Sequence, residues 1–289
     1  MHPYQLNVFK QMDKNEEWEH NGKKIIYFHN HIGRKSVAFT RYPDTSIIPE
    51  FLAHCKKTKF LPIIISDTKL HDLPCEEHYT QIIDLTKPFD EQVNRNVRRN
   101  IRLTEQAGFT IRTTNEWTTF NEIHNRMLTR KNIPFNPEKR SAIFKELEKE
   151  DGKTTTLYGA YQNNKLVAGV VLVYCDGIGA YVKIASDDTE INPSSLILKT
   201  ICEQEKKFTK LDLLLPPDVD QKSTEIKNIV KFKTQFGKRE TMYVHYHPAI
   251  YYGRKIKHAW RAALRSLVGR LRGNHASQGN SVNGQPNTT

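Results

Sequence analysis

The sequence predicts an α/β protein in which a mixed sheet is flanked by helices. The prediction depends on residues 156–236, which read as three strands, a helix, a strand and a helix. The central strand, 166–174 (LVAGVVLVY), is an almost unbroken apolar run, as expected of a strand buried on both faces. Polar turns separate it from the strands expected at 157–161 and 179–185.

A helix is expected after the polar loop 186–192. Pro193 is tolerated as a first helical residue, and Asn192 before it is a suitable N-cap. Apolar residues at Ile197, Ile201 and Phe208 predict that this helix continues to about Phe208. A buried strand at 211–215 (LDLLL) and a helix at 223–236 complete the segment.

The preceding residues predict three more helices. Apolar residues repeat every four positions from Phe89 to Ile101, so we expect one helix to begin at Pro88 and to end before Gly108. A strand is expected from Gly108 to 112. The second helix is expected after Asn115 as its cap, and the third after 136–137 (NP).

Residues 1–85 are expected to form a smaller α/β unit. Strands are predicted at 23–30, 36–42, 60–66 and 79–85, with a short helix at 49–58. This unit contains no glycine-rich phosphate loop and no nucleophile motif. The expected organisation is therefore 1–85, 86–249, a basic amphipathic helix at 250–273 and a disordered polar tail at 274–289.

Composition excludes several classes of protein. The 289 residues contain 37% hydrophobic residues and no apolar run long enough to cross a bilayer. The first ten residues lack the apolar stretch of a secretory signal, and the four cysteines are scattered, so we expect a cytoplasmic protein with reduced thiols. The histidine pairs 29/31 and 245/247 have no neighbouring carboxylate or cysteine, so no metal site is expected.

The net charge of +12 is concentrated near the C-terminus. From Ile250 onward there are seven lysines and arginines and no acidic residue. Residues 254–272 keep their apolar side chains on one stripe of a predicted helix. Three interpretations remain open: the helix docks on the domain, rests on an anionic membrane surface, or binds nucleic acid such as tRNA.

Six phrases in this order resemble one family. They are VNRNVRRNIRLTEQAGFTI (93–111), LYGAYQNNKLVAGVVLVY (157–174), AYVKIAS (180–186), PSSLILKTICEQ (193–204), LDLLLP (211–216) and IVKFKTQFGKRE (229–240). Together they resemble the FemAB-like acyltransferases of the GNAT superfamily, a group that includes the peptidoglycan-bridge aminoacyltransferases and short acetyltransferase-like members. The resemblance implies a GNAT-like mixed sheet in residues 86–249 and a truncated GNAT-like unit before it.

The resemblance also implies acyl or aminoacyl transfer to an amine of a cell-envelope or polysaccharide precursor. The co-substrate would be acyl-CoA or aminoacyl-tRNA, with no tightly bound cofactor. One departure concerns the loop before the helix at 193, where acetyl-CoA enzymes carry a glycine-rich pyrophosphate loop. Here residues 186–192 contain no glycine and three acids, which repel a pyrophosphate.

The resemblance assigns site residues by matching phrases. It implies Lys233 and Tyr181 as candidate catalytic residues, and Arg99 and Arg130 as candidate substrate-binding residues. Arg95, on the helix face of Arg99, and Lys183, on the expected strand face of Tyr181, are further candidate substrate-binding residues. The arginines at 95, 99 and 102 share a helix face, which is either a solvated surface or a phosphate site, since arginine grips phosphates bidentately. Tyr181 and Lys183 alternate with Val182, so we expect them to share one face of a strand.

Several of these side chains could instead have a purely structural role. Lys233 is either a solvated lysine or a site residue, and Arg130 either binds substrate or stabilises the end of its helix through the dipole. Asp212 lies in a buried strand, where it needs a partner. The alternative to an enzyme is a non-catalytic membrane- or RNA-binding protein that retains the fold. An enzyme at the inner membrane face is the main hypothesis, and it requires Lys233, Arg130 and Tyr181 to meet in one cleft.

Overall fold

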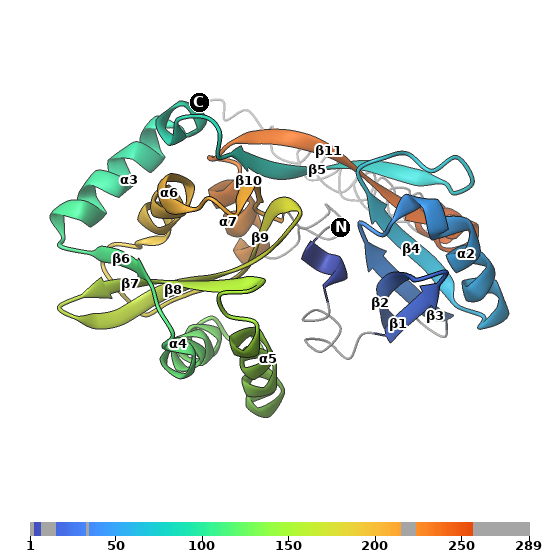
Figure 1. Ribbon diagram of the computed structural model, residues 1–289, viewed down its shortest axis with the longest axis horizontal. Helices are drawn as coiled ribbons and strands as arrows, with labels where there is room; N and C mark the ends of the chain where they lie inside the picture. The colour runs from blue at the N-terminus through green and yellow to red at the C-terminus, as the bar shows by residue number, and fades with distance from the viewer. Residues whose placement is uncertain (1–2, 7–15, 33–34, 215–223, 257–289) are drawn as a thin grey trace, which may run out of the picture.

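A single mixed sheet runs through the protein (Figure 1). The structure is a computed structural model that describes residues 3–6, 16–32, 35–214 and 224–256. The strand order in the described part is β1-β2-β3-β4-β11-β5-β10-β9-β8-β7-β6. The strands are β1 (Glu16–His20), β2 (Lys23–Ile32), β3 (Lys35–Arg41), β4 (Leu61–Ser66), β5 (Cys75–Asp84), β6 (Thr110–Thr113), β7 (Thr155–Gln162), β8 (Lys165–Cys175), β9 (Gly177–Ser186), β10 (Phe208–Asp212) and β11 (Lys238–Tyr246).

The strand β11 joins the two parts of the chain. It comes late in the sequence, yet it lies between β4 and β5 and pairs antiparallel with both. On its other side β5 pairs antiparallel with β10. The sheet therefore continues without a break from the first 85 residues into the rest of the chain.

Helices cover both faces of the larger part of the sheet. Figure 1 shows α3 and α6 on one side of β6–β9, and α4 and α5 on the other. The labelled helices are α2 (Ile48–Lys57), α3 (Arg95–Gln106), α4 (Trp117–Arg130), α5 (Pro137–Lys149), α6 (Ser194–Gln204) and α7 (Thr224–Lys233), with short 3-10 turns η1 (Pro3–Gln5), η2 (Thr45–Ile47) and η3 (Phe89–Gln92). Residues 248–256 are helical as well, which includes the first described part of the helix predicted at 250–273. None of the helices in the described ranges is both long and apolar enough to cross a bilayer.

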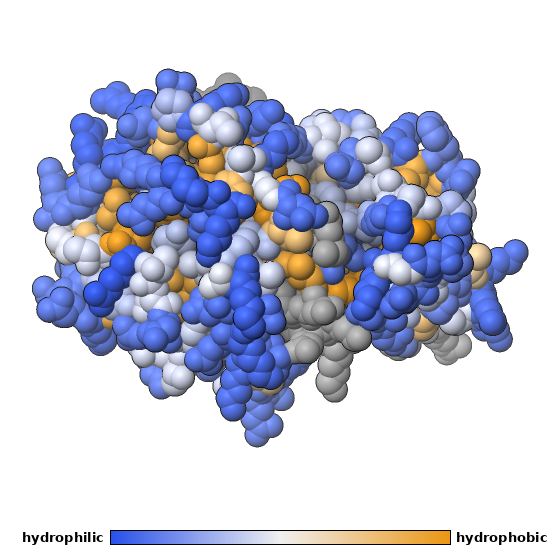
Figure 2. Space-filling model, in the orientation of Figure 1, coloured by the Kyte–Doolittle hydropathy of each residue, from blue (hydrophilic) through white to orange (hydrophobic). Residues whose placement is uncertain are grey.

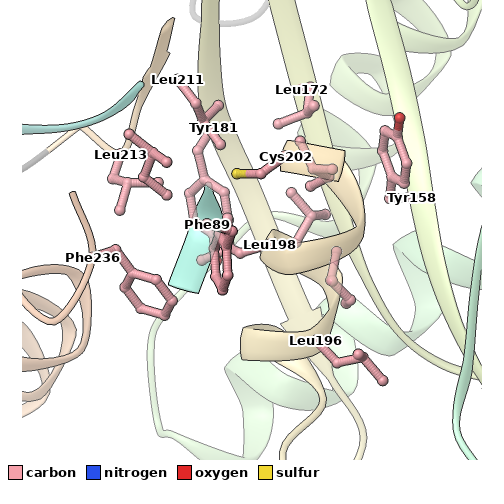
Figure 3. Packing of buried hydrophobic residues seen from close by; sticks show 14 of the residues in the cluster. Phe89, Tyr158, Leu172, Tyr181, Leu196, Leu198, Cys202, Leu211, Leu213 and Phe236 are labelled. Atoms are coloured by element: carbon pink, nitrogen blue, oxygen red, sulfur yellow. The ribbon is translucent and has the colours of Figure 1, made fainter. Parts of the chain in front are cut away.

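Each face of the sheet has its own apolar core. One core lies beneath α3 and α6 and includes Tyr181 and Phe236 (Figure 3). The other lies beneath α4 and α5 and includes Trp117 and Phe144. Because β8 contributes residues to both cores, its residues 166–174 are all buried, as the apolar run predicts.

The predicted elements exist, with corrections at their ends. The helix predicted from Pro88 begins only at Arg95, because Val93 is extended and forms a bridge with Phe236. Asn94 is the N-cap, since its side chain accepts a hydrogen bond from the Val97 N–H at 3.0 Å. Gly108 follows the helix end with a φ of +75°, as expected.

Three further corrections concern caps and strand ends. The α6 helix stops at Gln204, and Phe208 instead starts β10, which is shifted from the predicted 211–215. Asn115 does not cap α4 with its side chain. Asn136 does cap α5, and β1 was not predicted. The predictions for 257–273 and for the tail 274–289 lie outside the described residues.

Candidate active site

The sheet opens between β9 and β10. These two strands pair in parallel only where Gly177–Ala180 faces Phe208–Asp212. Beyond that point β9 continues from Tyr181 to Ser186, while the described part of β10 ends at Asp212. Because ligands of α/β sheets bind outside the carboxyl ends of parallel strands, this opening is a candidate ligand site.

A pocket of about 330 Å³ lies at this opening. The described residues that line it come from β9, from the start of α6, from α7 and from the turn after α4. They are Tyr181, Ile184, Asn192, Ser194, Asn228, Ile229, Phe232, Lys233 and Lys131. Two lysines and no carboxylate are among them, so the described wall of the pocket is electropositive.

Lys233 is held at the wall of this pocket. Its Nζ donates a hydrogen bond to the Leu214 carbonyl oxygen at 3.0 Å and lies 5.4 Å from the centre of the Tyr181 ring. Burial lowers the pKa of the Lys233 ammonium to about 8, although the Asp212 carboxylate opposes this shift. A lysine in this state is charged at neutral pH but titrates far below an exposed one.

Tyr181 forms the floor of the pocket. Its side chain is 4% exposed and lies within the core beneath α3 and α6 (Figure 3). Burial raises the pKa of the Tyr181 phenol, so the group is neutral at physiological pH. Its ring faces the Lys233 ammonium, an arrangement that favours a cation over the aromatic surface.

The start of α6 borders the same pocket through Ser194. Pro193 is the N-cap, and the Asn192 side chain accepts a hydrogen bond from the Ser194 N–H at 2.9 Å. The first N–H groups of a helix carry partial positive charge and favour anions. Together with Lys131 and Lys233, they give the pocket the electrostatic character of a phosphate site.

Two of the three acids in the loop before α6 face arginines of α4. Arg126 binds Asp187 through two hydrogen bonds of 2.9 Å, and Arg130 lies 3.8 Å from Asp188. Arg130 also donates to the Ser186 carbonyl oxygen at 3.1 Å. The expectation that these acids repel a pyrophosphate therefore omitted two arginines. Arg126 was missed, although it lies one helical turn before Arg130, opposite the acids.

Only part of the predicted cleft is assembled. Lys233 and Tyr181 line one pocket, as the hypothesis requires. Arg130 instead contacts the loop that forms the rim, and the next residue, Lys131, is the one that lines the pocket. Arg130 is thus positioned to hold the rim of the pocket.

Lys183 lies on the opposite face from Tyr181, so the prediction of a shared face is wrong. The cause is a β-bulge in β9: Tyr181 pairs with Leu172, but Lys183 pairs with Val171, which leaves Val182 as an extra residue. Val171 belongs to the core beneath α4 and α5, and the charge of Lys183 lowers the pKa of His124 on α4.

The arginines of α3 lie away from the pocket. Arg95 contributes to a separate depression of about 240 Å³ between α3 and α6, together with Arg98, Arg102 and Lys199. Arg99 is exposed on the same helix and lines neither cavity. The face of the molecule in Figure 2 is mostly hydrophilic, as expected of so basic a surface.

Comparison with solved structures identifies the fold. FemX superposes with a TM-score of 0.62 at 13% identity, covering 87% of this chain and 95% of FemX. The chain has the fold of FemX. The C-terminal domain of a putative lysylphosphatidylglycerol synthetase from Agrobacterium fabrum matches with a TM-score of 0.64 at 13% identity, covering 83% of this chain and 86% of that domain.

A third structure with this fold is L-PGS from Bacillus licheniformis. It matches with a TM-score of 0.61 at 14% identity, covering 84% of this chain and 87% of L-PGS. No family model matches the sequence, and no curated protein matches it. The fold resembles that of FemX, of the A. fabrum domain and of L-PGS, at a sequence identity of 13–14%.

Proposed function

We propose that this protein is an acyltransferase that moves an acyl or aminoacyl group from a phosphate-bearing carrier to an amine. The observation that carries the proposal is the pocket between β9, α6 and α7, where Lys233 and Lys131 face a helix N-terminus at the opening of a FemAB-like sheet. The names of the structural relatives, FemX and lysylphosphatidylglycerol synthetase, support the reaction class.

The described residues have complementary roles in such a reaction. Lys131 and the first N–H groups of α6 would bind a phosphate of the carrier. The Lys233 ammonium would stabilise the negative charge that develops on the carbonyl oxygen as the amine attacks. Tyr181 would hold that ammonium in place, and Arg130 would hold the rim of the pocket. Positioning and electrostatics supply most of the rate in this chemistry.

Two carriers are open in this proposal, acyl-CoA and aminoacyl-tRNA. The acceptor in this proposal is an amine of a cell-envelope or polysaccharide precursor, reached from the cytoplasmic side. The arginines of α4 weaken one objection to CoA, since Arg126 and Arg130 offset two of the three acids in residues 186–192. The basic surface of α3 favours a larger polyanion such as tRNA.

Thermal unfolding with each carrier tests the proposal. A ligand at about 100 times its dissociation constant stabilises a protein by roughly 2.7 kcal/mol. A shift with acetyl-CoA supports a CoA-dependent enzyme, and a larger shift with charged than with uncharged tRNA supports aminoacyl transfer. Equal shifts with all RNAs, and no transfer of a labelled acyl group to any amine, would support the rival non-catalytic binding protein.

Association with an anionic membrane surface through residues 254–272 is a further part of the proposal. In the described portion, Arg254 is bound to the fold: it donates to the Tyr246 hydroxyl at 2.6 Å and lies 3.4 Å from a Glu76 oxygen. Tyr252 and Ile256, one turn apart, are exposed. Sedimentation with vesicles, with and without anionic lipid, tests this part separately from catalysis.

A further inference from the structure

Leu214 has a backbone conformation that leucine rarely adopts. Its φ is +55°, in the left-handed region, where a side chain costs about 1–2 kcal/mol. Such a residue persists only where its surroundings hold it in place. Leu214 lies two residues after Asp212, the last residue of β10.

Two charged side chains hold Leu214 from opposite ends. Its N–H donates a hydrogen bond to Asp212 Oδ1 at 2.8 Å. Its carbonyl oxygen accepts a hydrogen bond from Lys233 Nζ at 3.0 Å. The backbone of one strained residue thus connects a carboxylate to the ammonium at the pocket wall.

Asp212 is buried deeply enough to require these partners. It is 2% exposed, and its Oδ1 also accepts a hydrogen bond from the Thr80 hydroxyl on β5. Burial raises the pKa of the Asp212 carboxyl, while the nearby charges of Lys233 and of Arg41 on β3 lower it. Because Asp212 is buried, its charge acts strongly on the position and the protonation of the groups around it.

We propose that Asp212 is a positioning residue, which fixes the Leu214 turn and thereby sets the place and charge of the Lys233 side chain. Its importance for catalysis rests on the proposed acyl transfer, but its effect on Lys233 does not. Among the described residues, the groups around Lys233 are Asp212 on β10, Arg41 on β3, the Tyr181 ring on β9 and Lys131 at the pocket wall. Among these charges, that of Asp212 opposes the loss of the Lys233 proton.

The test measures Lys233 itself. Competitive labelling of lysines with acetic anhydride, read by mass spectrometry from pH 6 to pH 11, gives the pH at which each amine loses its proton. In Asp212→Asn, which keeps the shape and an acceptor but removes the charge, we expect the Lys233 midpoint to fall by about one pH unit. Glu122→Gln, which removes an exposed acid on α4, is the matched control and should leave the midpoint unchanged.

A second variant covers the case in which Asp212→Asn does not fold. Thr80→Val removes one donor from the carboxylate, which favours its neutral form, so the Lys233 midpoint should move in the same direction by a smaller amount. An unchanged Lys233 midpoint in either folded variant overturns the inference.

Enzyme kinetics separates this inference from the proposed function. In Asp212→Asn we expect the turnover number to fall while the KM for the carrier changes little, because the defect is in the transition state. A shifted midpoint in a protein without transfer activity supports the link to Lys233 and refutes the proposed function. Transfer activity with an unshifted Lys233 midpoint supports the proposed function and refutes the link between Asp212 and Lys233.

Discussion

Arg126 Nε and Nη2 each lie 2.9 Å from one carboxylate oxygen of Asp187. This paired geometry crosses from α4 to the loop that precedes α6, so it fixes the rim of the pocket from the opposite side of the sheet. Burial contributes little to the strength of this ion pair, because the Arg126 side chain is 51% exposed. Its main effect is to cancel a negative charge near the start of α6.

Replacing Arg126 should therefore weaken carrier binding. In Arg126→Ala the Asp187 charge is no longer offset, and a partly exposed pair of this kind contributes up to about 1 kcal/mol. We expect the KM for the carrier to rise about two- to fivefold, with turnover little changed. Removing both charges in Arg126→Ala/Asp187→Asn should restore most of the affinity, and equal KM values in wild type and Arg126→Ala would contradict the prediction.

The rate of transfer should fall as the pH rises through about 8. The proposed role of Lys233 requires its ammonium form, and burial brings its pKa down to about 8. Lys233→Arg keeps a charge to much higher pH, so any remaining activity should lose this falling limb. A pH–rate profile checks both statements. A rate that increases through pH 8 would instead indicate a neutral lysine acting as base.

Acid should destabilise the protein through His124. This side chain is 5% exposed between Phe120 and Phe144, and burial, with the charges of Arg140 and Lys183, lowers its pKa to about 3. The folded state therefore binds this proton less readily than the unfolded state, and stability is lost as the pH falls from about 6.5 towards 3. The loss is about 2 kcal/mol at pH 5.

The variant His124→Gln isolates this contribution. Urea unfolding at pH 7 and pH 5 should show a smaller difference in stability for the variant than for wild type. His245, whose pKa is also lowered by burial, stays in both proteins and cancels in the comparison. An equal pH dependence in the two proteins would mean that His124 does not titrate as described.

Gly237 should tolerate no side chain. Its φ is +57°, and a Cβ built there would lie 1.9 Å from the Ile82 carbonyl oxygen on the neighbouring strand β5. We expect Gly237→Ala to cost more than about 2 kcal/mol of unfolding free energy. Gly22→Ala is the matched control: its φ of +73° is similar, but a Cβ there meets nothing within 4 Å, so its cost should be about 1 kcal/mol. If the two variants lose similar amounts of unfolding free energy, the backbone moves to avoid the clash between the new Cβ and the Ile82 carbonyl oxygen, and the prediction is wrong.

Much of this fold follows from local pattern. The apolar run of β8 and the four-residue spacing in α3 predict a buried strand and an amphipathic helix, and both are confirmed. The start of α3 was wrong because the extended conformation of Val93 comes from its bridge to Phe236, more than 140 residues away in sequence. Periodicity cannot report a pairing of that kind.

The site was less predictable than the fold. The pairing of Lys233 with Tyr181 agrees with the resemblance, but strict alternation placed Lys183 on the wrong face, since the bulge at Val182 has no signature in the local sequence. The contact between Arg126 and Asp187 depends on how α4 crosses the sheet. The left-handed turn at Leu214 carries neither glycine nor asparagine, the residues that usually mark such a turn.

The insertion of β11 has a consequence for synthesis of the protein. During synthesis β4 and β5 are made long before β11. The edges of β4 and β5 that pair with β11 in the native sheet therefore stay unpaired until β11 has been made. The β4 edge is rich in isoleucine, and apolar edges of this kind associate readily with other chains. Protection of these edges during translation, by a chaperone or by a transient pairing, would then decide how much of the protein reaches its native state.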